Sequence, residues 1–562
     1  MHRSFRSKIR GLPRSLPPSL ALLLFLLPAL RADVALHPLF SDYAVLQRDH
    51  PVPVWGTANA GEAVTVAFAG QTVSALADAR GRWLVRLAPV SATSKPQALV
   101  VRATNTVAVR DVVVGEVWLA AGQSNMASPL SSGSAAEALP SATDPLLRFF
   151  TVTKAISAEP LADVQGSWEP STPESARKFS AVAYFFAREL RLTQNIPVAV
   201  INASWGGTPI QTWMSLESLR REPPITRILA DWNKAHVQHL AVKDHPQRMV
   251  AYLEDMKAWE TDVMPAFKQA QRAHPETVEA AKAAGRPVPP SPKPARPEPV
   301  APDPIAMPAP SKRPNTPTIT YNAMIAPLVP YALRGVLWYQ GEADASRGLD
   351  YRVSFPRLIE GWRSAWGQGD FPFLYVQLPA NGRDPVPVAP SGLPFLREAQ
   401  LLTLGVSNTA MAVTVDIGDP ADVHPDNKVH VGHRLALLAR RMVHGEHLVS
   451  SGPIYAGSSL EGGTFRIRFS DTGGGLEIGQ APWVARGVQP LPTDRLQGFY
   501  IAGEDRIWVA ADARIDGETV LVSSPAVTQP KAVRYGWAHS PRINLSNRAG
   551  LPAAPFRTDD WN

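Results

Sequence analysis

The chain has 562 residues, of which 45% are hydrophobic and 19% charged, and it contains no cysteine. This length exceeds what one hydrophobic core usually organises, and the composition excludes wholesale disorder and a polytopic membrane protein. The lack of cysteine excludes disulfides, thiol nucleophiles and thiolate metal sites. The formal net charge is +7, but it falls to +1 without the first 32 residues. The remaining chain therefore has no global positive field for nucleic acid or acidic lipid.

Residues 1–32 have the pattern of an export signal. Basic side chains precede an apolar run from Leu20 to Leu30, and small residues follow near Ala32. The run has about eleven residues, fewer than the roughly 20 that a permanent membrane anchor needs. We expect cleavage near Ala32 and a periplasmic or secreted protein, with an uncleaved anchor as the alternative.

Residues 33–111 alternate apolar and polar positions in short runs separated by glycines, for example Val64-Val66-Phe68 and Trp83-Val85-Leu87. A period of two residues is typical of antiparallel strands, so this segment predicts an N-terminal β-sandwich. The final segment, residues 449–562, returns to the same alternation. It predicts a C-terminal β-rich module.

Residues 112–448 combine apolar strands with segments of helix length, which is the pattern of a parallel α/β sheet covered on both faces. The expected strands are Val112–Ala120, Val198–Ala203, Gly335–Tyr339, Phe373–Leu378 and Ala410–Asp416. The expected helices are Val182–Gln194, Tyr351–Trp366, Phe395–Leu404 and Lys428–Val443. We expect this α/β unit to be the catalytic domain.

A long insertion, residues 222–317, separates the second expected strand from the third. Met249, Leu253, Met256 and Val263 follow helical spacing in its first part. Residues 287–317 hold 13 of the 55 prolines, which favours an extended linker. The helical part could cap the active site, but a tolerated surface insertion is the preferred interpretation.

The strand expected at Val112–Ala120 runs through a short turn of small residues directly into Ser124. In a parallel α/β sheet, reactive groups gather at the carboxyl ends of the strands, so Ser124 stands where a nucleophile is expected. A helix starting after it would direct backbone amides towards an oxyanion. The position also suits an N-capping serine, so Ser124 alone does not decide between these roles.

The strand expected at Ala410–Asp416 leads into a segment that combines carboxylates with an imidazole. A hydroxyl nucleophile needs an imidazole base whose second ring nitrogen donates to a carboxylate. His424 is the candidate base and Asp422 the candidate acid, with Asp416 and Asp419 as competing acids.

The same segment offers a second interpretation as a metal site. Asp422, His424, Asp426 and His430 are all potential ligands, but Lys428 interrupts them and no H-E-x-x-H pattern accompanies them. The sequence also contains no phosphate-binding loop. We therefore expect neither a metal nor a cofactor.

Two further strand ends carry groups that could stabilise an oxyanion. Gly206 and Gly207 follow the strand Val198–Ala203 and can bring backbone amides close to a ligand, although a tight turn would require glycine equally. Gln340 follows the strand Gly335–Tyr339 and could polarise a carbonyl group.

Other residues at these strand ends are candidates for substrate binding. Glu342 could accept sugar hydroxyls, whereas Asp344 is interpreted as a solvated loop acid. Trp205, Trp213 and Trp338 could stack on sugar faces, with packing in the core as the alternative for each.

Four individually ambiguous motifs thus fall at the carboxyl ends of four strands. Together they supply the nucleophile, oxyanion donors and acid–base pair of acyl transfer. The blocks that carry them resemble the sialate O-acetylesterase family of SGNH hydrolases and related carbohydrate acetylesterases. These blocks are Gly115-Glu116-Val117-Trp118, Gly122-Gln123-Ser124-Asn125-Met126, Trp205-Gly206-Gly207, Trp338-Tyr339-Gln340-Gly341-Glu342, Asp422-Val423-His424-Pro425 and the run from Asn547 to Thr558.

The resemblance implies a metal-free esterase with a flavodoxin-like, three-layer α/β/α domain flanked by β modules. It makes Ser124 the nucleophile and His424 the base, with the Ser124 amide, an amide of the Gly206–Gly207 pair and the Gln340 side chain lining the oxyanion hole. Many SGNH enzymes have Asp three residues before the His and Asn in the third block. This chain has Ala421 and Gln340 there.

We expect a serine esterase that removes O-acetyl groups from carbohydrate, with sialate as the first substrate. Acetylated xylan or xyloglucan is the alternative substrate, and a non-catalytic carbohydrate-binding protein is the alternative class. An arginine directed into the site would favour sialate, because it would pair with the sugar carboxylate. The acetyl position and the oligomeric state stay open.

Overall fold

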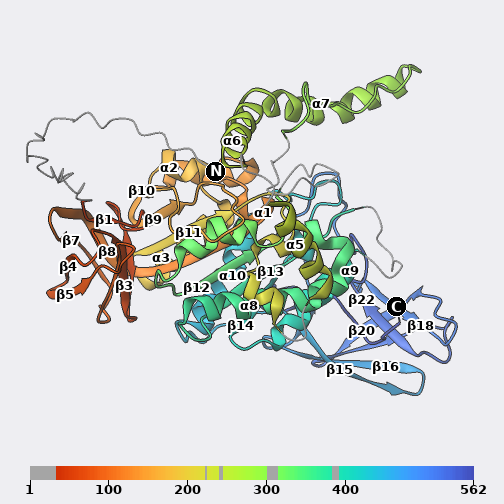
Figure 1. Cartoon of the computed structure of the whole chain (residues 1–562). Helices are drawn as coiled ribbons and strands as arrows, with labels where there is room; N and C mark the ends of the chain where they lie inside the picture. The colour runs from red at the N-terminus through yellow and green to blue at the C-terminus, as the bar shows by residue number, and fades with distance from the viewer. Residues whose placement is uncertain (1–32, 222–224, 240–244, 300–313, 383–391, 562) are drawn as a thin grey trace, which may run out of the picture.

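The computed structural model describes residues 33–221, 225–239, 245–299, 314–382 and 392–561 (Figure 1). The expected export signal, residues 1–32, lies outside the described residues. Within these described ranges, no helix is both long enough and apolar enough to cross a membrane.

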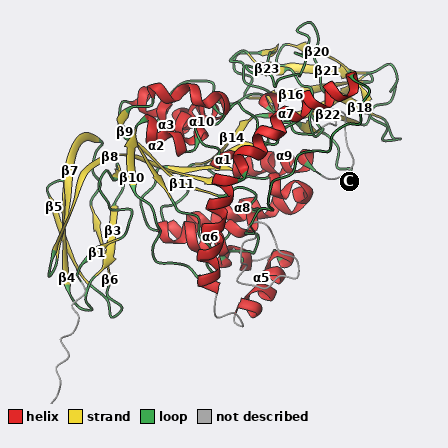
Figure 2. Ribbon diagram, turned by 90° about the horizontal axis from the view of Figure 1, so that it is seen from above, coloured by secondary structure: helices red, strands yellow, loops and turns green. Residues whose placement is uncertain are grey.

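The N-terminal module is β-rich, as the alternation predicted. The first sheet has the order β1-β3-β6. In the second sheet, β4 pairs with β5 and with β7, and the long strand β8 pairs with β7 and with β2. Figure 2 shows the two sheets as separate layers. The strands are β1 Ala35–Leu36, β2 Val45–Gln47, β3 Val52–Thr57, β4 Ala63–Phe68, β5 Gln71–Leu76, β6 Arg82–Leu87 and β7 Thr93–Arg102.

Strand β8, Thr106–Gly122, joins this module to the central sheet without a break. Its first half pairs with β7, and its second half lies between β11 and β12. Every residue from Val112 onward is buried, whereas burial alternates before it. The expected domain boundary between residues 111 and 112 therefore falls inside one strand, where a half-exposed sheet becomes a fully covered one.

The central sheet has the order β10-β9-β11-β8-β12-β13-β14. All neighbours from β9 to β14 are parallel, and β10 is antiparallel at the edge. The five expected strands are confirmed, whereas β9 and β10 were not expected because proline interrupts both. The strands are β9 Asp144–Thr151, β10 Trp168–Ser171, β11 Val198–Ser204, β12 Gly335–Tyr339, β13 Phe373–Gln377 and β14 Thr409–Val413.

Helices pack on both faces of this sheet. Trp118 contacts Phe186 of α3, with ring centroids 5.0 Å apart, and Trp338 packs on Trp362 of α8 at 5.8 Å. Trp118 pairs with Gly335, which is three residues from Trp338, so the two tryptophans point to opposite faces. The four expected helices are α3, α8, α9 and α10, each confirmed to within three residues.

The helices are α1 Ser124–Ala127, α2 Pro173–Lys178, α3 Ala181–Gln194, α4 Leu216–Arg220, α5 Thr226–His239, α6 His245–Asp262, α7 Met264–Ala283, α8 Gly348–Trp366, α9 Leu393–Leu402 and α10 Val429–Met442. Short 3₁₀ segments cover Gly133–Ser141, Ile210–Trp213, Ala326–Leu328, Glu342–Arg347, Thr403–Gly405 and Val415–Ile417, and a π turn covers Tyr321–Ile325.

The insertion contributes helices α5, α6 and α7, so its helical first part is confirmed. Met249 of α6 is buried, and α7 projects from the rest of the molecule in Figure 1. Residues 286–299 of the proline-rich part have no regular secondary structure, and residues 300–313 lie outside the described ranges.

The C-terminal module consists of three small sheets of orders β15-β16-β21-β20, β17-β23 and β19-β18-β22-β24. It is fixed to the central domain by buried Arg397 of α9, which donates to the carbonyls of Ala538 at 2.7 Å and His539 at 2.9 Å. The strands are β15 Ile454–Glu461, β16 Thr464–Ser470, β17 Leu476–Ile478, β18 Phe499–Ala502, β19 Val509–Ala510, β20 Asp512–Asp516, β21 Thr519–Ser523, β22 Ala532–Tyr535, β23 Leu545–Asn547 and β24 Phe556–Arg557.

Candidate active site

The candidate site lies at the carboxyl edge of the central sheet, beyond the end of β8. Gly122, the last residue of β8, pairs with Ser204 at the end of β11 and with Tyr339 at the end of β12. The chain visits β11 on one side of β8 before it crosses to β12 on the other. This reversal of strand order is the place where open α/β sheets bind ligands.

Ser124 and His424 are in hydrogen-bond contact at this edge. The imidazole Nε2 lies 2.8 Å from the Ser124 hydroxyl oxygen, across 300 residues of sequence. Gly122 makes the turn possible, because its φ is 135° and a side chain there would collide with the Tyr339 carbonyl oxygen. The helix that follows Ser124 has only four residues, so it contributes little of the expected helix dipole.

Asp422 is the carboxylate that contacts the imidazole. Its Oδ1 lies 3.5 Å from Nδ1 of His424 and accepts the His424 backbone N–H at 2.8 Å. This hydrogen bonding lowers the pKa of Asp422 below its usual value. The competing carboxylates are engaged elsewhere, since Arg434 holds Asp416 through two 2.6 Å contacts and Asp419 accepts from the backbone of Ala421.

The glycine turn after β11 lies next to the nucleophile turn. The backbone N–H of Trp205 donates to the Gly122 carbonyl at 2.9 Å, which continues the β8–β11 pairing to the start of the turn. Gly207 is exposed with φ of 75°, a conformation that favours glycine. Helix α6 of the insertion approaches this turn, because Lys154 lies over the Trp205 ring and 3.9 Å from Glu260.

Gln340 does not offer a free donor to an oxyanion. Its side chain is fully buried, and its Nε2 donates to Asp344 at 2.7 Å and to the Thr208 carbonyl at 3.1 Å. Its Oε1 accepts from Tyr351 at 2.9 Å. Both amide hydrogens are therefore used within the core, and the expected direct contact with substrate is wrong. Asp344, expected as a solvated loop acid, is likewise buried.

The expected sugar-stacking tryptophans belong to the core. Trp213 and Trp338 have no exposed surface, and Trp205 is 2% exposed. Trp338 is enclosed by Trp213 and by Phe355 and Trp362 of α8. The stacking interpretation is therefore wrong for these residues, because buried rings present no face to a ligand.

Glu342 lies at the site but is directed inward. Its Oε1 accepts from Nδ2 of Asn125 at 2.5 Å, and its buried Oε2 has no hydrogen-bond partner among the described residues. Burial raises the pKa of this carboxyl above its usual range. Val423 and His539 join it in lining a small cavity of about 150 Å³.

Sequence reasoning assigned no role to Asn125 and Lys428, which the structure brings into the site. The Lys428 ammonium donates to Oδ1 of Asn125 and to the Pro425 carbonyl, both at 2.6 Å. Lys428 is 3% exposed, and burial lowers its pKa to about 8. Its position four residues after His424, at the start of a helix, was the available signal.

The residues considered as metal ligands do not converge. Asp426 accepts from the backbone of Ser134, and His430 contacts Asn427. Across the described ranges, no group of three or more His, Asp or Glu side chains is placed to hold a metal ion.

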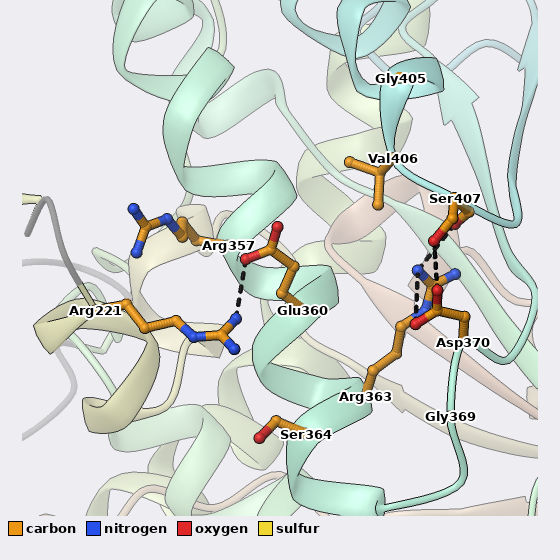
Figure 3. A pocket seen from close by; sticks show the side chains of 10 residues that line it. All are labelled: Arg221, Arg357, Glu360, Arg363, Ser364, Gly369, Asp370, Gly405, Val406 and Ser407. Atoms are coloured by element: carbon orange, nitrogen blue, oxygen red, sulfur yellow. Dashed lines mark hydrogen bonds and ion pairs between the residues drawn. The ribbon is translucent and has the colours of Figure 1, made fainter.

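A large open pocket of about 840 Å³ lies at the opposite edge of the sheet (Figure 3). Its lining includes Asp370 and Ser407, which precede β13 and β14, whereas Ser124 follows the end of a strand. Two ion pairs lie in its lining, Arg221 with Glu360 at 2.9 Å and Arg363 with Asp370 at 3.9 Å. Ser407 donates to Asp370 at 2.5 Å in this pocket, but no histidine is among its lining residues, and the pocket is separate from the candidate site.

Comparisons with known proteins find carbohydrate esterases. A family model described as "Carbohydrate esterase, sialic acid-specific acetylesterase" matches residues 311–441. The sialate O-acetylesterase of Rattus norvegicus is 30% identical in an alignment 458 residues long, which covers 74% of this chain and 74% of that protein. The Homo sapiens sialate O-acetylesterase is 28% identical in an alignment that covers 71% of this chain and 69% of that protein. A solved structure, a novel carbohydrate acetylesterase from Xanthomonas citri, is 36% identical with a TM-score of 0.72, covering 94% of this chain and 100% of that chain.

A serine hydroxyl bonded to an imidazole is the arrangement of hydrolases that act through an acyl-enzyme. Together with these relatives, it defines the protein as a carboxylic ester hydrolase. The chain belongs to the sialate O-acetylesterase family, which confirms the resemblance found in its sequence blocks.

Proposed function

We propose that this protein removes O-acetyl groups from carbohydrate, with sialic acid as the sugar, Ser124 as the nucleophile and His424 as the general base. The observation that supports the mechanism is the 2.8 Å contact between the Ser124 hydroxyl and His424 Nε2. The support for the substrate is that the relatives covering about three quarters of the chain are named sialate O-acetylesterases.

The reaction proceeds in two steps. His424 Nε2 takes the hydroxyl proton as the Ser124 oxygen attacks the acetyl carbonyl, and the imidazolium then gives that proton to the departing sugar oxygen. Water, deprotonated by the same imidazole, attacks the acetyl-enzyme and releases acetate, and Ser124 regains its proton. Asp422, 3.5 Å from Nδ1, stabilises the imidazolium in both steps.

The oxyanion of each tetrahedral intermediate is bound by backbone amides. The amide of Ser124 and the turn at Gly206–Gly207 lie at adjacent strand ends, so they can donate to the same oxygen. Gln340 acts indirectly, because its amide holds Asp344 and the Thr208 carbonyl beneath this turn.

The same proposal assigns the catalytic domain to the SGNH type, with a flavodoxin-like, three-layer α/β/α arrangement. The strand order β11-β8-β12-β13-β14 supports it, because it is the 2-1-3-4-5 order of that class with β9 and β10 added at one edge.

The first experiment is acetate release by the purified protein from acetylated sialic acid, acetylated xylo-oligosaccharides and p-nitrophenyl acetate. We expect sialic acid to be preferred and Ser124→Ala to lower kcat by more than about 10⁴-fold on every ester. Ser128→Ala is the matched control, because Ser128 caps the same short helix, and it should retain activity.

Each outcome separates one part of the proposal from the rest. An active Ser124→Ala protein would contradict the nucleophile. Preference for xylo-oligosaccharides, lost in Ser124→Ala, would keep the mechanism and replace the sugar. A wild-type protein without activity on any ester would favour the carbohydrate-binding alternative.

A further inference from the structure

Lys428 is a buried cation whose contacts lead to both halves of the candidate catalytic pair. Its ammonium donates at 2.6 Å to the side chain of Asn125, the residue that follows the nucleophile. It also donates at 2.6 Å to the carbonyl of Pro425, the residue that follows His424. One side chain thus connects the turn after β8 with the loop after β14.

Asn125 closes this connection from the other side. Its Nδ2 donates to the carbonyl of Val423 at 2.9 Å and to Glu342 at 2.5 Å. The two residues flanking His424, Val423 and Pro425, are therefore both tied to Asn125, one directly and one through Lys428. The backbone on either side of the imidazole is fixed relative to the nucleophile.

We propose that Lys428 is a positioning residue that acts through Asn125 to hold the His424 loop against Ser124. This proposal rests on the proposed function, because it takes Ser124 and His424 as the reacting groups. The His424 side chain is 47% exposed, so packing alone does not fix the imidazole. Hydrogen bonds from a charged donor are shorter and stronger than neutral ones, which suits this task.

The main test compares Lys428→Met with the wild type in kcat, KM and the rate of Ser124 labelling by a fluorophosphonate. Met retains the volume and removes both hydrogen bonds. We expect kcat and the labelling rate to fall about 100-fold, as a displacement near 1 Å can produce. KM should change by less than about threefold, because no contact with substrate is removed.

Arg440→Met is the matched control. It removes a cation from α10, the helix that begins directly after Lys428, but Arg440 contacts Glu446 and Glu189 away from the site. Its kcat and labelling rate should match the wild type. If both variants lose activity equally, or if Lys428→Met loses thermal stability while its kcat per folded molecule is unchanged, the positioning role is overturned.

A double-mutant cycle tests whether Lys428 acts through Asn125. Asn125→Ala leaves the lysine in place and removes its link to the nucleophile turn. We expect the double variant Asn125→Ala with Lys428→Met to be no slower than the slower single variant. If the fold-loss of kcat in the double variant equals the product of the two single losses, the coupling is overturned. The nucleophile assignment would be untouched. That assignment fails only if Ser124→Ala remains active or is still labelled.

The pH profile supplies a readout that a purely structural lysine would not give. Burial lowers the pKa of Lys428 to about 8, while the charged groups facing it, Glu342, Asp422 and Asp426, oppose that shift. Activity should decline above about pH 8 as the ammonium becomes a weaker, neutral donor. Stability should rise over the same range, because the unfolded lysine keeps its proton to a higher pH. The decline should be missing in Lys428→Met, and its persistence there would contradict the proposal.

Discussion

The two edges of the central sheet each bury a carboxylate, and the two carboxylates have opposite surroundings. Near the amino end of the parallel section of β8, Glu116 contacts Arg48 at 2.9 Å, Arg334 at 3.2 Å and His444 at 3.3 Å. At the carboxyl end of β12, Glu342 receives one hydrogen bond and leaves its Oε2 unpartnered among the described residues.

The difference appears in their pKa values. Burial alone would raise the pKa of Glu116, but His444, Arg334 and Arg48 outweigh it and lower the pKa to about 2. For Glu342 burial dominates, and the pKa is raised. Glu116, at the edge far from Ser124, is thus paired with several cationic groups. Glu342, at the edge where Ser124 and His424 meet, has few partners, as expected where function competes with stability.

The largest expected effect is at the satisfied edge. Glu116→Gln should lower the free energy of unfolding by about 3 kcal/mol, because it leaves the two arginines without their buried partner. Activity per folded molecule should not change, since these residues lie at the opposite edge from Ser124. Urea unfolding followed by tryptophan fluorescence, with acetate release on the same samples, measures both quantities.

The pH dependence of unfolding checks the same carboxylate. The folded pKa of about 2 lies below the usual 4.5, so the contribution of Glu116 is fully present above about pH 4.5 and is lost as the pH falls towards 2. Glu116→Gln should lack this part of the acid sensitivity. Equal acid sensitivity in the two proteins would show that Glu116 is not the group that titrates.

The reverse pattern is expected for Glu342→Gln. Its glutamine can still accept from Asn125, and the desolvation of a carboxylate is removed, so stability should change by less than about 1 kcal/mol. The activity should fall by about tenfold in kcat, because the charge beside Asn125 and Lys428 is lost and their alignment loosens. If Glu342→Gln loses much stability while its kcat is unchanged, Glu342 has the same structural role as Glu116. That result would contradict the comparison.

The sequence predicted the elements of the central sheet well because each has a pattern of its own. The five expected strands are apolar runs of five to nine residues, and the expected helices have an apolar face. Strands β9 and β10 were missed because Pro145 and Pro170 break the pattern. Pro145 is the second residue of β9, and Pro170 lies in β10 at the edge of the sheet, where proline is tolerated. The expected boundary between residues 111 and 112 falls inside β8 because burial changes there from alternating to continuous within one strand.

The candidate site was only half predictable. The contacts among Ser124, His424 and Asp422 could be anticipated, because each residue follows a strand or lies near another reactive group in sequence. Gln340 was misassigned because its partners Asp344 and Thr208 are fixed by tertiary contacts, which spacing does not reveal. The same limit applies to Trp338. The sequence near an aromatic residue at a strand end is the same whether its ring faces solvent or the core.

The smallest expected effect concerns an exposed carboxylate at the same edge as Glu342. The Asp422 side chain is 58% exposed and lies 3.5 Å from the imidazole, so water screens their interaction and its contribution is below about 1 kcal/mol. Asp422→Asn should therefore lower kcat by about threefold, less than Glu342→Gln does, although Asp422 is the carboxylate that contacts the imidazole. Acetate release at pH 7 ranks the two variants. A loss of 1,000-fold or more in Asp422→Asn, about the effect of a buried triad aspartate, would show that this carboxylate becomes enclosed when substrate binds, and would reverse the order of the two residues.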